Sequence, residues 1–129
     1  MPGAVGRKKA RQSRERYIQQ IKRYLPTITY VLYRQRLSPK LVNKLSPLVL
    51  TLLRDLFRNC VDSRGALFAQ AQSDPEICRC RKILQDLAET RDAPQFRKVV
   101  KQQKGSGVWL PITMAAMAIP ELIRLIRGQ

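Results

Sequence analysis

The chain has 129 residues, with 25 Lys or Arg against 9 Asp or Glu, and its formal net charge is +16. This length fits one domain with tails, and an excess charge of this size favours a polyanionic partner, either nucleic acid or an anionic membrane surface. The sequence contains no histidine, which removes the usual base of catalytic triads and a common zinc ligand, so we expect no enzyme, no catalytic residue, no cofactor and no metal.

Residues 1–16 are predicted to form a disordered basic tail, because their first six residues offer nothing to pack. The charge there is not followed by an apolar run, so the segment is not predicted to be a secretory signal. No stretch reaches the roughly 18 apolar residues that span a bilayer, and no membrane partner is predicted. We expect the tail to lie along phosphates through Arg7, Lys8, Lys9, Arg11, Arg14 and Arg16.

Residues 17–100 are predicted to form one helical domain. Apolar residues recur at helical spacing from Tyr17 onward. Pro26 lacks an amide hydrogen and suits the first turn of a helix, so it predicts one helix up to Tyr24 and a second from Pro26 to Gln35. Lys22 and Arg23 extend the basic arm, and a loop is expected around Pro39.

The widest apolar stripe of the chain predicts a long central helix from Ser46 to Gln72. Ser46 can cap its start with Pro47 in the first turn, and Gly65 is not expected to stop it. At about 1.5 Å per residue such a helix is ~40 Å long. The short flanking helices cannot cover so long a stripe, so a partner subunit is expected. The core residues assigned to that interface are Leu52, Leu56, Phe57, Leu84 and Leu87.

Further helices are predicted to begin at Asp74–Pro75 and at Asp92–Pro94, ending near Glu89 and Val100. Residues 101–129 are read as a polar loop, an apolar irregular segment with Trp109 as a packing anchor, and a helix from Thr113 to Arg127. No strand pattern is apparent. The cysteines at 60, 78 and 80 are expected to be free thiols, with the pair at 78 and 80 divided between core and surface rather than binding metal.

The order of short helix, loop, long helix, loop and short helix resembles the histone fold. Leu25–Pro26 and Ser46–Pro47–Leu48–Val49–Leu50 resemble the openings of the first and central helices of the histone two-A class. Arg91–Asp92 with Phe96–Val99, and the segment 104–112, resemble its later helix and its docking segment. The resemblance covers residues 25–112 and suggests a divergent core histone, viral or otherwise distant, with an all-α histone fold, a basic arm, a docking segment and an extra C-terminal helix.

The resemblance implies a heterodimer with a two-B-like histone that binds double-stranded DNA without sequence preference in a nucleosome-like particle, located in the nucleus, in chromatin or in a virion. It implies that other core histones contact the docking segment through Val108, Trp109, Leu110 and Ile112. Cations of the first helix and its loop are expected on DNA, namely Arg34, Arg36, Lys40 and Lys44. Those expected from the second loop are Arg79, Arg81 and Lys82.

The chain also departs from the histone pattern. Thr29 stands where the family places a minor-groove arginine, and Cys60 and Ser63 occupy positions that are normally acidic. Two alternative hypotheses therefore stay open. One is a membrane-active or host-interaction protein, based on the basic arm and the amphipathic end from Met114 to Arg127. The other is a helical RNA-binding protein, disfavoured by the lack of clustered exposed aromatic residues in the sequence.

Overall fold

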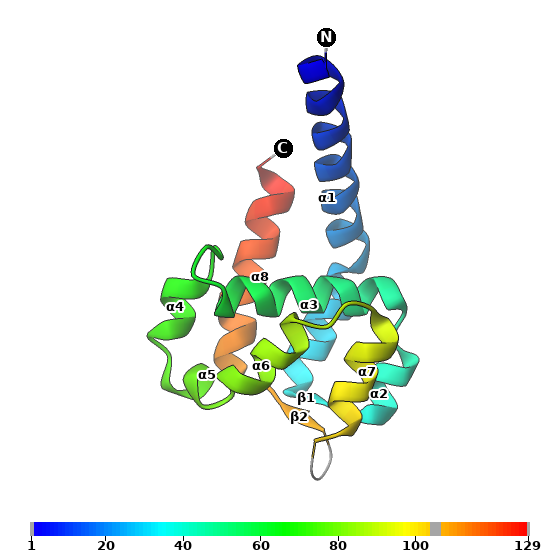
Figure 1. The fold of residues 1–129 in the computed structure, drawn as a ribbon. Coiled ribbons are helices and arrows are strands. Elements are labelled where there is room, and N and C mark those ends of the chain that lie inside the picture. Colours follow the sequence, from blue (N-terminus) through cyan, green and yellow to red (C-terminus); the bar gives the residue numbers. More distant parts are fainter. Residues whose placement is uncertain (1, 104–106, 129) are drawn as a thin grey trace.

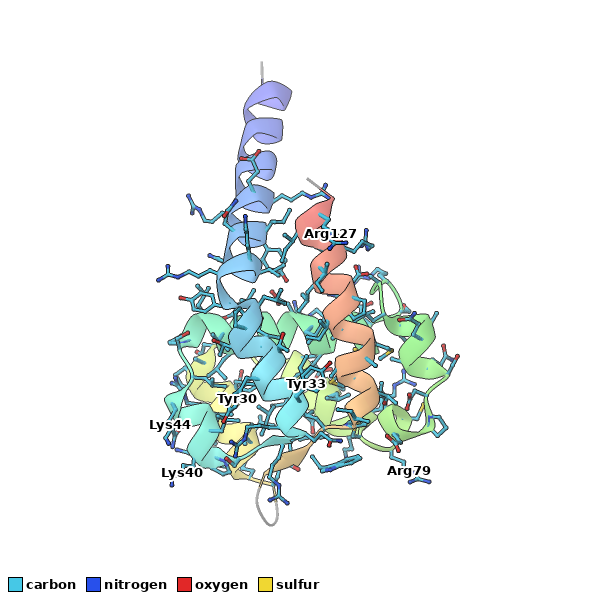
Figure 2. All side chains as sticks on the ribbon, turned by 180° about the vertical axis from the view of Figure 1, so that it is seen from behind. Tyr30, Tyr33, Lys40, Lys44, Arg79 and Arg127 are labelled. Atoms are coloured by element: carbon cyan, nitrogen blue, oxygen red, sulfur yellow. The ribbon has the colours of Figure 1, made fainter. Side chains whose placement is uncertain are left out.

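The computed structural model describes residues 2–103 and 107–128, and for residues 2–12 it describes the backbone alone. Within these ranges the chain is mostly helical, which confirms the all-α class. The central helix α3 (Pro47–Val61) lies between two layers (Figures 1 and 2). One layer consists of the side-by-side helices α1 (Pro2–Arg34) and α8 (Ile112–Arg127). The other contains α6 (Arg81–Ala88) and α7 (Ala93–Lys101).

Short elements complete the fold. Helix α2 (Pro39–Lys44) packs on α7, and α4 (Phe68–Gln72) returns along α3. Helix α5 (Pro75–Arg79) connects α4 to α6 and contacts α8. The strands β1 (Arg36–Leu37) and β2 (Val108–Trp109) pair as an antiparallel ribbon, which the sequence analysis did not predict.

Helix α1 runs without a break from Pro2 to Arg34, so the predicted disordered tail and the predicted interruption at Pro26 are both wrong. Pro26 leaves the Lys22 carbonyl without its helical donor, but it lies on the exposed side of the helix. Buried apolar residues on both sides of it, among them Ile21 and Ile28, hold the helix against the core. Tertiary packing therefore outweighs the local cost of the proline.

Helix α3 ends at Val61 rather than Gln72, so the predicted long central helix is wrong. The chain reverses at Gly65, whose missing side chain allows the backbone to approach Asn59 so closely that a Cβ would overlap the Asn59 carbonyl oxygen. The Leu67 amide then donates to that carbonyl at 3.2 Å, and the Asp62 side chain accepts from the Arg64 amide at 2.9 Å. Gly65 thus stops the helix by permitting a tight reversal.

The predicted helix starts are confirmed where a side chain caps the first turn. Ser46 accepts a hydrogen bond from the Val49 amide at 3.3 Å, and Asp92 accepts one from Gln95 at 2.9 Å. Asp74 caps α5, but the helix expected to continue to Glu89 breaks at Cys80 into α5 and α6. Pro39, expected in a loop, begins α2 instead, because Ser38 accepts from the Leu41 amide at 3.0 Å.

The apolar stripe of α3 is covered by the chain's own helices, so the reason for expecting a partner subunit does not hold in this structure. Phe57 stacks on Phe96 of α7 with ring centroids 6.4 Å apart. The five core residues assigned to a partner interface are at most 4% exposed, namely Leu52, Leu56, Phe57, Leu84 and Leu87. Helix α8 also belongs to this core, since it buries Met114, Ala115, Ala118 and Leu122.

Candidate nucleic-acid interface

One group of predicted cations lies on α1 between Arg7 and Arg23, and the beginning of this helix projects beyond the body of the molecule (Figure 1). We call this region the arm end. The predicted cations with described side chains there are all exposed, namely Arg14, Arg16, Lys22 and Arg23. Arg7, Lys8, Lys9 and Arg11 belong to α1, but their side chains lie outside the described part. Arg127, which the sequence analysis did not assign to DNA, lies on α8 toward the same end (Figure 2).

A second group lies at the opposite end of α1, around the two-stranded ribbon. We call this region the ribbon end, and its four predicted cations are exposed, namely Arg34, Arg36, Lys40 and Lys44. Helix α1 stops here because Gln35 adopts a positive φ of 59°, which turns the chain into β1. Lys40 and Lys44 follow on α2 (Figure 2).

The third predicted group comes from the second loop and consists of Arg79, Arg81 and Lys82, all exposed on α5 and α6. The Arg81 guanidinium lies over the Phe68 ring, 5.9 Å from its centroid. Arg79 lies on the opposite flank of the molecule from Lys40 and Lys44 (Figure 2). The structure therefore does not bring the two predicted loop groups together within one chain.

Few of the exposed cations are neutralised by neighbouring carboxylates. Among residues 13–103 and 107–128, the ion pairs join Arg54 to Asp55, Arg64 to Asp62 and Arg124 to Glu121. Hydrogen bonds from Arg64 lower the pKa of Asp62, and those from Arg124 lower the pKa of Glu121. None of these three arginines is a predicted DNA contact, so the predicted cations whose side chains are described remain available to an external anion.

Arg54 also has a structural task, which it shares with Arg58 and Arg97. Arg58 donates to the Ala88 carbonyl at 2.8 Å, and Arg54 donates to the Arg91 carbonyl at 3.1 Å. Arg97 donates to the carbonyls of Val42 and Leu45 at 3.2 and 3.0 Å. These hydrogen bonds satisfy carbonyl groups at the ends of α2 and α6 and in the link between α6 and α7, where the backbone lacks a helical partner. They fasten α6, α7 and α2 around α3.

The predicted docking segment is divided by the ribbon into buried and exposed residues. Val108 and Leu110 are 3% and 0% exposed, so they belong to the chain's own core. Trp109 is 53% exposed and Ile112 is 44% exposed. Trp109 was expected to be a packing anchor, and that prediction is wrong, because its neighbours along the strand take the inward positions.

The sequence analysis also missed two exposed aromatic residues at the ribbon end. Tyr30 and Tyr33 are 53% and 56% exposed, and both lie on the outward face of α1 (Figure 2). The signal was present in the sequence, because neither tyrosine falls on the apolar positions of that helix, such as Ile28 and Val31. The argument that the chain lacks exposed aromatic residues for base stacking therefore loses its basis.

The cysteines lie near the junction of α3, α5 and α6, and all three are free thiols. Burial is the main cause that raises the pKa of Cys60 to about 12 and that of Cys80 to about 11. Both thiols are therefore protonated and poorly nucleophilic at neutral pH. Within the described residues no cluster of Cys, Asp and Glu could hold a metal ion.

The described helices include none that is both long enough and apolar enough to cross a membrane. The amphipathic end from Met114 to Arg127, on which the membrane-surface hypothesis rested, directs its apolar face into the core. Comparisons with protein-family models, with curated proteins and with solved structures found no match.

Proposed function

We propose that the protein binds double-stranded DNA through phosphate contacts that do not depend on base sequence, and that it packages the DNA. The observation that carries this proposal is the exposure of every predicted cation whose side chain is described, without a carboxylate partner among those residues. Lys and Arg in this state bind phosphates by displacing condensed counterions.

The positions of the cations support packaging. The arm end and the ribbon end are at opposite ends of α1, a helix of 33 residues, which at about 1.5 Å per residue spans ~50 Å. One molecule can therefore contact two stretches of DNA at once and bring them together. Contacts of this kind read the backbone and not the bases.

Nuclease digestion tests the packaging proposal. The chain is mixed with long duplex DNA of two unrelated sequences, and protected fragments are measured over a range of protein concentrations. We expect equal protection of both sequences, and a clear loss of protection for a variant with Arg34, Arg36, Lys40 and Lys44 all changed to Gln. Equal protection by that variant, or no protection by the unaltered chain, would contradict the proposal.

A more specific form of this proposal is a core-histone-like subunit that pairs with a two-B-like histone. Its support is the order of the segments between Leu25 and Ile112 and the capped helix starts at Ser46 and Asp92. Such pairing requires α3 and α4 to join through Gly65 into one helix and to exchange contacts with α6 for contacts with a partner.

The variant Gly65→Ala distinguishes a histone-like subunit from a chain that acts alone. Alanine favours one continuous helix through α3 and α4 by about 1 kcal/mol, but its Cβ would overlap Asn59 in the reversal that the structure shows. The variant and the unaltered chain are each co-expressed with candidate partner histones and examined by size-exclusion chromatography. Stronger pairing by the variant supports the histone-like subunit. A destabilised variant that pairs with no partner contradicts the histone-like subunit. That result does not bear on the proposal that the single chain binds DNA.

A further inference from the structure

An open hollow at the ribbon end combines cations with an exposed indole ring. Its lining consists of Arg34, Gln35, Arg36, Ser38 and Trp109, and its volume is about 470 Å³. This is within the size range of small-molecule sites, about 300–1,000 Å³. The hollow is formed by the end of α1 and by both strands of the ribbon, which lie far apart in the sequence.

The backbone that presents Trp109 is firmly anchored. In the ribbon Trp109 is paired with Arg36, while the next pair, Leu37 and Val108, is buried. Paired residues of a ladder share one face, so the indole and the Arg36 guanidinium both stand on the outer face. The amide of Leu110 also donates to the Gln35 carbonyl at 2.8 Å.

Gly107 permits the close approach that forms this ribbon. Its φ is 105°, which side chains rarely allow, and a Cβ there would overlap the carbonyl oxygen of Leu37. The buried side chains on either side of Trp109 hold the strand in place. The ring is therefore exposed because the backbone presents it outward, and an exposed indole beside cations is a common feature of binding surfaces.

The neighbouring face of α1 adds further aromatic and cationic groups. Arg34 donates from Nη1 to the Tyr30 hydroxyl oxygen at 2.6 Å, and its guanidinium lies 5.5 Å from the centre of the Tyr30 ring. These contacts hold the Arg34 side chain in a defined orientation. Tyr33, on the same outward face, is also more than half exposed (Figure 2).

We propose that this hollow binds an unpaired nucleobase of single-stranded nucleic acid, with the base stacked on Trp109 and the adjoining phosphate bound by Arg34 and Arg36. The inference rests on the proposed nucleic-acid binding and gives the ribbon end a ligand of its own. Bases in a duplex are stacked on one another and cannot lie on the ring, whereas unpaired bases stack readily on aromatic side chains.

Trp109 is the only tryptophan of the chain, so its fluorescence reports directly on the site. The full chain is titrated with oligothymidylate, with oligouridylate of equal length, with an abasic strand of equal length and with a duplex. We expect both base-bearing single strands to quench the fluorescence, and the abasic strand and the duplex to bind with little quenching. Quenching by only one of the two would still place a base on Trp109 and would show that the sugar or the thymine methyl group also contributes to binding.

Variants are then compared by the anisotropy of labelled strands, which needs no tryptophan. Trp109→Ala should bind oligothymidylate about 5- to 150-fold more weakly, which corresponds to about 1–3 kcal/mol for one stacked base, and should bind duplex as before. Trp109→Phe should retain most of the affinity. Ile112→Ala, which removes another exposed apolar side chain near the ribbon, is the matched control and should change nothing.

Equal quenching by the abasic strand, or unchanged single-strand affinity in Trp109→Ala, would overturn the nucleobase site. Either result, together with normal duplex binding, would leave the proposed packaging function standing. A chain that binds neither duplex nor single strand would overturn both proposals. Circular dichroism of each variant establishes that the fold is intact.

Discussion

The two ends of α1 carry similar charge but offer different chemistry. At the arm end the cations lie on a helix whose beginning extends past the body of the protein, and the described ones are exposed (Figure 1). At the ribbon end they lie on a backbone fixed by strand pairing, beside Trp109 and two exposed tyrosines. Charge alone attracts any polyanion, and it is the fixed aromatic surroundings that give the ribbon end a means to select its ligand.

A substitution in the core between the two ends should have the largest effect, and that effect is on the stability of the fold. Phe57→Ala should lower the free energy of unfolding by about 3–5 kcal/mol, because the large side chain is fully buried against Phe96 and leaves a cavity. Both binding activities should then be lost together on heating. Thermal unfolding followed by circular dichroism measures the loss, and the melting temperature should not depend on protein concentration if the core is closed within one chain. A concentration-dependent melting temperature would indicate that a second chain completes the core.

Removal of residues 2–16 should weaken duplex binding by the arm end without affecting the ribbon end. This truncation deletes the cations Arg7, Lys8, Lys9, Arg11, Arg14 and Arg16. Each phosphate contact contributes about 0.9 to the slope of log affinity against log salt, so the slope for duplex should become shallower by up to about 5. Quenching of Trp109 by saturating oligothymidylate should remain unchanged. A truncated chain that also loses this quenching would show that the two ends do not act separately.

Gly107→Ala should impair the ribbon end and leave the arm end intact. The added Cβ overlaps the Leu37 carbonyl oxygen, and the φ of 105° disfavours a side chain. The strain costs about 1–3 kcal/mol and should displace the ribbon. We expect quenching by oligothymidylate to fall while duplex binding by the arm end persists, as measured by fluorescence and anisotropy on one sample. Full quenching in this variant would mean that the ribbon does not position the ring.

Single cations give the smallest expected effect. Arg36→Gln should make the salt slope for duplex shallower by about 0.9, the value of one phosphate contact. Arg64→Gln removes an equal charge from an exposed arginine that is already paired with Asp62, and it should change the slope less. Equal slopes for the two variants would show that the position of a cation does not matter for binding.

The parts of the fold that could be predicted depend on local interactions. Ser46, Asp74 and Asp92 cap helices through hydrogen bonds to amides two or three residues away, and the sequence alone shows such patterns. The excess of cations is likewise visible in the composition. The all-α class follows from helical spacing of apolar residues over most of the chain.

The parts that could not be predicted depend on contacts between distant segments. The end of α3 at Val61 requires the backbone at Gly65 to approach Asn59. The exposure of Trp109 follows from its pairing with Arg36, more than seventy positions earlier in the sequence. The wrong length of α3 then led to the expectation of an uncovered stripe and a partner subunit.

The most direct test of the central claim is the affinity of the full chain for duplex DNA as a function of salt concentration, measured with two unrelated sequences of equal length. The account predicts that log affinity falls linearly and steeply with log salt, with the same slope and the same affinity for both sequences. An affinity that is insensitive to salt, or that differs strongly between the two sequences, would contradict it.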